Sequence, residues 1–413
     1  MATLKLYWDD PFARAFEARA LTLGQWQGKP SIVLDRTLFY PEAGGQLADQ
    51  GTLVIGERSL AIDDVQVDDD GVIHHLGADV GSLADTVGAA DAQARGEIAM
   101  PRRRDFMAQH TAQHALSRAL LDAAGAATVS SRLGENACTI DVDRAEIHER
   151  DIARAEELVN AIVLDDVPVR ALFPTAEDLA KMDLRRAPKV SQNVRIIDIE
   201  GFDLSPCGGT HCTRTGQIGS VRVVGVERYK GKIRISFHAA RRALDDVRAK
   251  EGVLTALAGE LTCGPLDVGA AVGKLRSDLK ARTDQLAALR GELVDRIAED
   301  VWRENPVEAG GVTLVVLTRP KDDVAMLRSL AGRVAARKDI VAVCGAPDPE
   351  SGEVFVVVQR GAEATRFDCG AWLKAAATEI GGRGGGRPER AEGRLKLASL
   401  EALGELAKRA LRS

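Results

Sequence analysis

The chain has 413 residues, of which 45% are hydrophobic and 28% are charged, a balance typical of a globular protein. This length exceeds one ordinary core and predicts about two to three domains. The apolar runs are much shorter than a membrane span and the start lacks the layout of a signal peptide, so we expect a cytoplasmic protein. Six scattered cysteines do not suggest a disulfide scaffold, and the net charge of −6 by itself does not indicate a nucleic-acid-binding protein.

The first 95 residues are rich in short β-prone runs and are expected to form a small β-barrel-like domain. Strands are expected at 31–35 and 51–55, on either side of the turn-forming segment 40–46. Residues 96–242 show a mixed α+β pattern. Helices are expected over 106–121 and 144–164 because apolar residues recur there at helical spacing, and strands are expected at 194–199, 221–226 and 233–237.

Residues 243–306 are predicted to form a helical spacer. Its apolar row follows the spacing of heptad a and d positions and consists of Val272, Leu275, Leu279, Leu286, Leu289 and Leu293. Arg282 and Arg296 interrupt this row. Two interpretations therefore stay open: an imperfect coiled coil that joins two copies in a homodimer, or a helix that packs within its own chain.

Residues 307–413 are predicted to form a final α/β unit. A homodimer could also form through this unit instead of through the helical spacer. Strands are expected at 311–317, 340–344 and 354–358, with a helix over 324–336. The segment 381–387 contains five glycines and two arginines, Arg383 and Arg387. We interpret it as a loop that presents backbone N–H groups and guanidinium groups to phosphate, with a plain connecting loop as the equal alternative.

Two pairs of side chains predict a metal site. His110 and His114 are four residues apart in an expected helix, so both imidazoles lie on one face. Cys207 and His211 are also four apart, in a glycine-rich turn that allows close approach. Each pair alone is a weak signal. Together the three imidazoles and one thiolate are a ligand set suited to a single Zn²⁺.

A hydrogen-bonded cluster without a metal is the main alternative for these side chains. The residues between the two helical histidines are Thr111, Ala112 and Gln113. The pair therefore lacks the glutamate that acts as general base in His-Glu-x-x-His metalloproteases. We do not expect protease chemistry of that type.

Three motifs follow one another along the chain: residues 37–41 (Thr-Leu-Phe-Tyr-Pro) with 44–46 (Gly-Gly-Gln), residues 110–114 (His-Thr-Ala-Gln-His) and residues 207–211 (Cys-Gly-Gly-Thr-His). In this order they resemble the editing domain of alanyl-tRNA synthetases and its free-standing relatives, the AlaX trans-editing proteins. The C-terminal unit, with its segment 381–394, looks like the DHHA1 domain at the end of alanyl-tRNA synthetases. The resemblance covers nearly the whole chain. Because the editing module comes first in this sequence, the layout looks like the long form of AlaX.

This resemblance implies a zinc-bearing editing domain at 96–242 and a tRNA-binding, DHHA1-like domain at 307–413. It also implies deacylation of mischarged tRNA(Ala), chiefly Ser-tRNA(Ala), with Gly-tRNA(Ala) as a second candidate. The expected zinc ligands are His110, His114, Cys207 and His211, and the two helical histidines also belong to the expected catalytic site. The expected tRNA contacts are Arg383, Gly384, Gly385, Gly386 and Arg387.

The resemblance places Thr37 and Gln46 near the seryl group and the terminal adenosine. A hydroxyl such as that of Thr37 can hydrogen-bond the serine side chain, an interaction that alanine cannot make. Leu47 follows Gln46 where the family often has proline, a departure that bears on the shape of this loop and not on the activity.

Two questions stay open at this point. Four protein ligands leave no position for water, so zinc either positions the substrate or loses one ligand to activate water.

The alternative functions are editing of Ser-tRNA(Thr), whose synthetase has a similar histidine and cysteine pattern, and non-catalytic tRNA binding with structural zinc. The kinship of the C-terminal unit with phosphodiesterases carries little weight, because the chain has no Asp-His-His motif.

Overall fold

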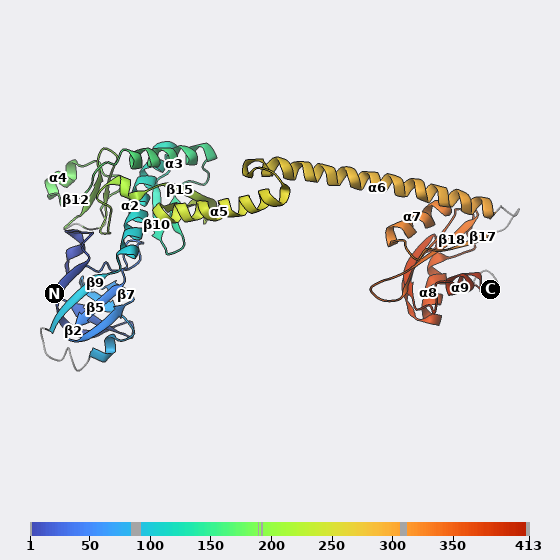
Figure 1. Cartoon of the computed structure of the whole chain (residues 1–413), viewed down its shortest axis with the longest axis horizontal. Helices are drawn as coiled ribbons and strands as arrows, with labels where there is room; N and C mark the ends of the chain where they lie inside the picture. The colour runs from blue at the N-terminus through green and yellow to red at the C-terminus, as the bar shows by residue number, and fades with distance from the viewer. Residues whose placement is uncertain (1, 84–91, 189, 191–192, 306–311, 410–413) are drawn as a thin grey trace. The chain divides into compact units, whose positions relative to one another are not determined.

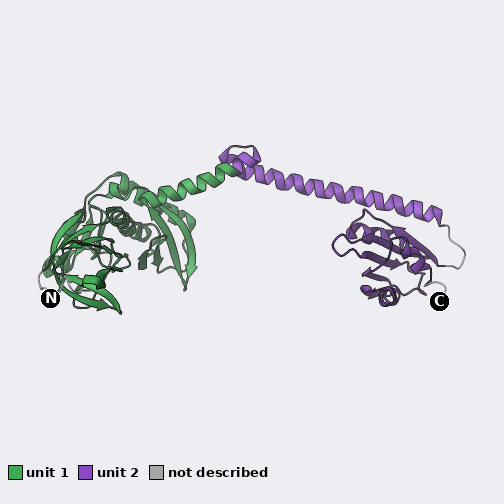
Figure 2. Ribbon diagram, turned by 60° about the horizontal axis from the view of Figure 1, so that its bottom comes forward, with its two compact units in different colours: residues 1–256 green, residues 257–413 purple. Residues whose placement is uncertain are grey.

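The computed structural model describes residues 2–83, 92–188, 190, 193–305 and 312–409. It divides into two compact units, residues 1–256 and residues 257–413 (Figure 2). Each unit has its own clusters of buried apolar side chains. The finer division into four domains stays a prediction, and its last boundary, between 306 and 307, lies outside the described residues.

A seven-stranded antiparallel sheet forms the N-terminal part of the first unit (Figure 1). In spatial order its strands are β6 (Arg58–Ile62), β5 (Gly51–Ile55), β9 (Ala92–Ile98), β2 (Ala15–Trp26), β3 (Lys29–Leu34), β8 (Ile73–Leu76) and β7 (Asp64–Val67). Both expected strands are confirmed. Asp63 alone joins the outer strands β6 and β7, so the sheet must curl strongly. Closure into a barrel is not confirmed.

The histidine-bearing helix α2 (Met100–Ala124) lies inside the rest of the first unit, and residues 106–117 are all buried. Helix α3 (Glu149–Leu164) packs against it. One sheet has the order β10 (Thr128–Leu133), β11 (Cys138–Val142), β16 (Lys232–Ala239) and β15 (Val221–Tyr229), and another has the order β12 (Val169–Leu172), β13 (Ile196–Ile199) and β14 (Asp203–Pro206). These helices and strands confirm the mixed pattern. Helix α3 begins later than expected, where two acidic residues favour its first turn.

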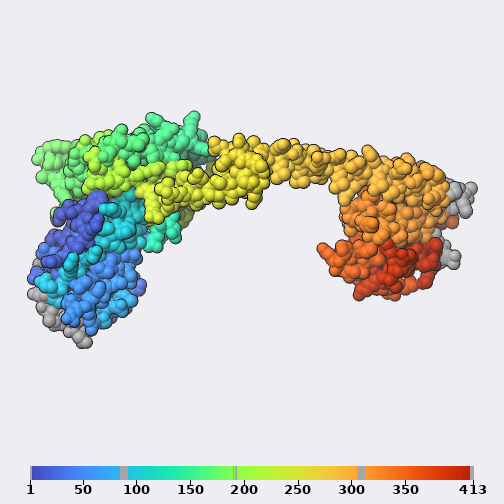
Figure 3. Space-filling view, viewed as in Figure 1, coloured from blue at the N-terminus to red at the C-terminus, as the bar shows by residue number. Residues whose placement is uncertain are grey.

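A buried ion pair ties the start of α2 to the N-terminal region. Arg103 is 0% exposed, and its Nε lies 3.0 Å from both carboxylate oxygens of Asp49, which is 1% exposed. The guanidinium also donates to two backbone carbonyls, and Asp49 accepts a hydrogen bond of 2.7 Å from the N–H of Tyr40. This pair sets α2 against the segment 37–49. In Figure 3 the N-terminal region (blue) and the residues that follow it (cyan to green) form one continuous surface.

The second unit contains a five-stranded sheet with the order β17 (Thr313–Thr318), β18 (Ile340–Pro347), β19 (Val354–Arg360), β21 (Arg390–Leu395) and β20 (Gly382–Arg387). The first two strands are parallel and the other pairs are antiparallel. Helix α7 (Val324–Val334) and the end of α6 (Val268–Glu304) pack on one face. Helices α8 (Cys369–Ile380) and α9 (Ala402–Arg409) pack on the other, which confirms the expected α/β unit.

The glycine-rich segment 381–387 does not form a loop, because most of it is the outer strand β20. Its backbone pairs with β21 along the whole strand. The glycines permit this close packing, since a Cβ at Gly384 would lie 2.9 Å from the side chain of Leu373, and one at Gly386 would lie 2.4 Å from the Cα of Ala391. The prediction of a loop is wrong because strand pairing outweighs the low β propensity of glycine.

The apolar row of the helical spacer lies on α6 and is exposed, even though α5 (Ala240–Leu261) and α6 form the helices expected there. Its members are 41% to 67% exposed: Val272, Leu275, Leu279, Leu286, Leu289 and Leu293. The structure does not show this row packing within its own chain, and it does not support a homodimer. Among the described residues, no helix combines the length and the hydropathy needed to cross a bilayer.

Replacing Asp49 with alanine is expected to destabilise the first unit, because Arg103 would stay buried without a countercharge. We expect the free energy of unfolding in urea to fall by about 3 kcal/mol or more. Glu135→Ala is the matched control: Glu135 pairs with the neighbouring Arg102 but is 59% exposed, so we expect a loss below about 1 kcal/mol. Equal, small losses in the two variants would contradict the role of the buried pair.

Candidate metal centre

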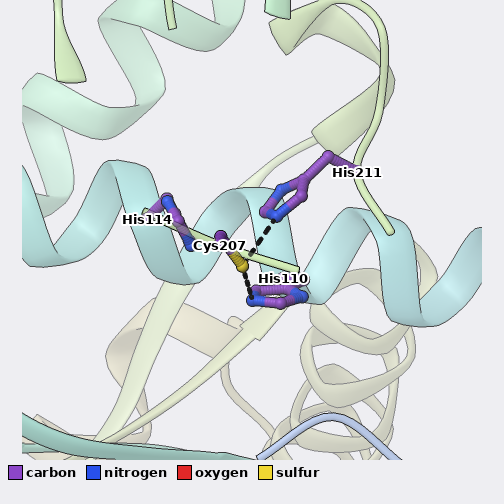
Figure 4. A group of neighbouring side chains, drawn as sticks. All are labelled: His110, His114, Cys207 and His211. Carbon is purple, nitrogen blue, oxygen red and sulfur yellow. Dashed lines mark hydrogen bonds between the residues drawn. The ribbon is translucent and has the colours of Figure 1, made fainter. Parts of the chain in front are cut away.

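Four side chains from distant parts of the sequence meet beside the middle of α2 (Figure 4). His110 and His114 project from one face of the helix, and Cys207 and His211 belong to the segment that follows β14. Their ligand atoms all lie within 4.8 Å of one another. The three histidines are 1% to 3% exposed. The structure thus brings together the four residues that the spacing pattern selected.

Gln46 orients the imidazole of His110. Nδ1 of His110 donates to Oε1 of Gln46 at 2.7 Å, and Nε2 lies 3.4 Å from Sγ of Cys207. Gln46 is held in turn, since its Nε2 donates to Oγ1 of Thr210 at 2.8 Å. An amide oxygen only accepts, so the proton is on Nδ1 and the lone pair of Nε2 faces the centre. Gln46 is 0% exposed and acts on the site through this histidine.

Thr111 orients the imidazole of His211 in the same way. The hydroxyl of Thr111 donates to the carbonyl oxygen of Met107 at 2.8 Å, which leaves its oxygen as the acceptor for Nδ1 of His211 at 3.3 Å. The other nitrogen, Nε2, lies 3.4 Å from Sγ of Cys207. Thr111 also accepts the backbone N–H of Cys212 at 3.0 Å, so the residue links α2 to the glycine turn.

Asp203 faces the third histidine. Nδ1 of His114 lies 3.6 Å from Oδ2 of Asp203, an ion-pair distance that exceeds a hydrogen bond and leaves this buried nitrogen without a closer acceptor. Asp203 is fixed by Arg185, whose Nε donates at 2.7 Å, and by the hydroxyl of Ser205 at 2.8 Å. Burial raises the pKa of Asp203, but His114 and Arg185 outweigh it and lower that pKa to about 2.

The electrostatics favour a thiolate at Cys207. Burial raises the pKa of this thiol, but the three histidines more than offset burial and hold the pKa well below its usual range. Burial lowers the pKa of His110 and of His211. Burial also acts to lower the pKa of His114, but Cys207 and Asp203 outweigh it and raise that pKa. A thiolate beside two imidazoles whose pKa is lowered is close to the protonation state that metal binding requires, and a bound metal would displace the proton of His114.

The glycine turn 207–211 is held by two side chains from outside it. Arg195 donates to the carbonyl oxygens of residues 207 and 209 at 2.9 and 2.8 Å. The indole N–H of Trp8 donates to the carbonyl oxygen of residue 208 at 2.9 Å. A Cβ at Gly209 would lie 2.2 Å from Cε1 of His110, so a glycine is required where the turn meets the helix.

The spacing of these atoms fits a tetrahedral metal site. Zinc binds thiolate sulfur at about 2.3 Å and imidazole nitrogen at about 2.0 Å, which separates sulfur from nitrogen by roughly 3.5 Å. The corresponding distances from Sγ of Cys207 are 3.4 Å to Nε2 of both His110 and His211. Each histidine also has a polar group beside its other nitrogen, as metal-binding histidines do. The cluster therefore has the donor atoms and the spacing that a metal ion needs.

Thr37 does not contact the four-residue cluster in the structure. It lies at the end of the short strand β4 (Arg36–Thr37), which pairs with β1 (Leu4–Lys5), and it is 0% exposed. Nδ1 of His75 donates to the carbonyl oxygen of Ile32, so the hydroxyl of Thr37 donates to Nε2 of His75 at 2.8 Å. Thr37 also accepts the N–H of Phe39 at 3.0 Å. Its expected contact with substrate stays a prediction.

The residues expected to contact tRNA lie on β20 in the second unit. Arg383 and Arg387 share one face of this strand, with Gly385 between them. A Cβ at Gly385 would meet nothing within 4 Å, so the space above it is open. A neighbouring hollow is lined by Phe355, Arg383, Gly384, Glu392, Gly393 and Arg394. Their role in binding also stays a prediction.

Sequence reasoning missed Thr111, Asp203, Arg195 and Trp8. Thr111 was visible as the residue after His110 on a predicted helix, and Asp203 as a carboxylate four positions before Cys207. Either could have been considered as a partner for a ligand histidine. Arg195 and Trp8 carry no such local signal, because only the fold brings them to the glycine turn.

Asp203→Asn is expected to weaken metal binding about ten- to a hundredfold, because it removes the negative charge that faces His114. Competition with a chromogenic chelator measures this affinity. Asp198→Asn, on the neighbouring strand β13, is the matched control and should leave the affinity unchanged. Unchanged affinity in both variants, with metal-free proteins of equal thermal stability, would exclude the role of Asp203.

Three family models match the chain. Residues 194–236 match the "Threonyl and Alanyl tRNA synthetase second additional domain", residues 16–90 match "tRNA synthetases class II (A)", and residues 311–413 match the "DHHA1 domain". Among solved structures, the C-Ala domain of Aquifex aeolicus alanyl-tRNA synthetase has 21% identity and a TM-score of 0.23, covering 25% of this chain and 95% of that domain.

Curated proteins similar to this chain include alanine–tRNA ligases. The ligase of Halorubrum lacusprofundi is 33% identical over 399 residues, which is 95% of this chain and 42% of the ligase. The ligase of Burkholderia thailandensis is 28% identical over 404 residues, which is 94% of this chain and 45% of the ligase. The chain thus spans less than half the length of these relatives. The matches confirm the resemblance carried by the motifs: the chain is an AlaX-like relative of the alanyl-tRNA synthetases, with their editing-type and DHHA1 sequences.

Proposed function

We propose that the chain is a zinc-dependent trans-editing hydrolase that deacylates mischarged Ser-tRNA(Ala), with Gly-tRNA(Ala) as a second substrate. One observation carries this proposal. Three buried histidines and the partly buried Cys207 form one centre, and its Cys207 and His211 come from the segment that matches the second additional domain of threonyl and alanyl tRNA synthetases. Zn²⁺ is the proposed occupant, with one ion per chain, because this mixed nitrogen and sulfur donor set suits it.

Deacylation is the attack of water on the aminoacyl carbonyl, which breaks the ester bond and returns a proton to the ribose oxygen. A bound Zn²⁺ would supply a concentrated positive charge beside the ester. The chain supplies a rigid frame, since Gln46, Thr111 and Asp203 each face one of the ligand histidines. Four protein ligands complete a tetrahedron. Two roles for the site therefore stay open. The site either positions the amino group and ribose of the substrate, or one of the four ligands leaves the metal so that water can bind there.

We assign Thr37 to the recognition of the seryl hydroxyl. Its proton goes to His75 and one lone pair accepts the N–H of Phe39, which leaves one lone pair for a donating hydroxyl. Alanine has no hydroxyl to make this bond, and a site built around such a bond discriminates strongly. Because Thr37 is 0% exposed, the contact requires a local opening of segment 37–46. Gln46 belongs to the same site through His110.

We assign tRNA binding to the second unit. The open face of β20 presents Arg383 and Arg387 on either side of Gly385, an arrangement that suits phosphate groups. Gly384 and Gly386 complete the strand and keep it close to its neighbours. The match of residues 311–413 to the DHHA1 domain supports this assignment. Binding through phosphate contacts weakens as salt rises, because bound counterions are released.

Two other functions each have an observation in their favour. The matching family model describes threonyl as well as alanyl tRNA synthetases, which favours Ser-tRNA(Thr) as the alternative substrate. The complete set of four ligands is typical of structural zinc, which favours a non-catalytic tRNA-binding protein. The DHHA1 match and the alanine–tRNA ligase relatives favour tRNA(Ala) over tRNA(Thr).

The test compares hydrolysis of Ser-tRNA(Ala) and Ala-tRNA(Ala) by the purified chain. We expect the seryl ester to be lost at least about a hundredfold faster. Cys207→Ala should lose both the metal and the activity, because one ligand is removed. Cys212→Ala replaces the adjacent buried thiol, which is outside the cluster, and should keep both.

Three outcomes would count against parts of this proposal. Equal, slow loss of both esters would remove the substrate assignment, and faster loss of Ser-tRNA(Thr) would favour the threonine alternative. Full metal content in Cys207→Ala would remove the ligand assignment. Binding of tRNA without any hydrolysis by the wild type would favour structural zinc.

A further inference from the structure

The strand register places Phe173 in the same row across the three-stranded sheet as the ligand Cys207. In the three-stranded sheet, Leu172 pairs with Ile196, and Ile196 pairs with Pro206. The residues next to this row are therefore Phe173, Arg195 and Cys207, at the same end of the sheet. The N–H of Cys207 donates to the carbonyl of Arg195 at 3.0 Å, which continues the pairing. With strands about 4.8 Å apart, Phe173 lies roughly 10 Å from Cys207.

Trp8 joins this row from the N-terminal region. It lies at the end of the short helix η1 (Leu6–Trp8), and its indole N–H bonds to the glycine turn at Gly208. The ring centroids of Trp8 and Phe173 are 5.9 Å apart. Phe173 is 55% exposed, although the ring of Trp8 lies beside it. The pair forms an accessible aromatic surface beside the centre.

Cationic side chains flank this surface. Nζ of Lys5 lies 4.7 Å from the ring centroid of Trp8. Arg186 is exposed and donates to the carbonyl oxygen of Pro206 at 2.9 Å, directly before the ligand cysteine. Aromatic faces next to positive charge are the combination that binds single-stranded nucleic acid.

We propose that Trp8 and Phe173 form a stacking surface for the unpaired nucleotides at the 3′ end of the RNA substrate. The inference rests on the proposed function, which requires a single-stranded aminoacylated end at the metal centre. The bases would stack on the exposed ring of Phe173 while Lys5 and Arg186 contact the phosphates. Every base has a π-face, so this surface guides the strand toward Cys207 without reading its sequence.

The test uses uncharged RNA, so that binding is measured apart from hydrolysis. The probes are two fluorescent acceptor-stem hairpins, one with a four-nucleotide single-stranded 3′ end and one blunt-ended. The full-length chain should bind the first more tightly. Phe173→Leu keeps the apolar volume but removes the aromatic face, and should weaken binding of the overhanging hairpin about tenfold without changing binding of the blunt one. Phe173→Tyr should bind as the wild type does.

Two further variants sharpen this test. Tyr229→Leu removes another aromatic ring of the first unit, one with a guanidinium 3.5 Å from its centroid, and should leave the preference for the overhang unchanged. Lys5→Gln should lower the salt dependence of binding by about one unit of slope, because one phosphate contact is lost. The zinc content of Phe173→Leu should equal that of the wild type.

The results separate this proposal from the proposed function. The stacking surface is overturned if the wild type binds both hairpins equally, or if Phe173→Leu keeps the full preference for the overhang. A preference that depends on Phe173 in a chain that hydrolyses no aminoacyl ester would support the stacking surface and contradict the hydrolase. Hydrolysis of the aminoacyl ester by a chain whose preference for the overhanging hairpin does not depend on Phe173 would support the hydrolase and contradict the stacking surface.

Discussion

The partly buried Cys207, whose pKa is held well below its usual range, must be surrounded by correctly oriented imidazoles, and the rest of the first unit depends on this constraint. Charge is costly to bury, so Cys207 needs compensating groups at close range. Three imidazoles can compensate it only if each turns one nitrogen toward the sulfur. Gln46, Thr111 and Asp203 face the opposite nitrogens of those rings. The orientation of the three ligand imidazoles is therefore set by three other residues, which lie beside the ring nitrogens that point away from the sulfur.

These orienting groups also explain how distant segments act together. Gln46 comes from the N-terminal region and Thr111 from α2, while Asp203 comes from β14. The buried pair of Arg103 and Asp49 ties the first two segments together, and Trp8 and Arg195 hold the glycine turn. A substitution at any of these contacts would move a ligand without removing it. The N-terminal region thus contributes to the site by holding its ligands in place.

The sequence was sufficient for features that depend on local spacing. Helical periodicity put His110 and His114 on one face, and the glycine turn identified Cys207 and His211 as a second pair. Features that depend on contacts between distant segments could not be predicted. The partner of Thr37 is His75, on another strand, and the row of Phe173, Arg195 and Cys207 exists only through strand register. Glycine-rich β20 was misjudged because its pairing with β21 overrides residue propensity.

X-ray absorption spectroscopy of the zinc-loaded chain shows whether these four side chains together hold one ion. We predict one sulfur neighbour at about 2.3 Å and three imidazole nitrogens at about 2.0 Å. A second spectrum of Cys207→Ala should lack the sulfur neighbour. A zinc environment without sulfur in the wild type, or one with two sulfurs, would contradict the account.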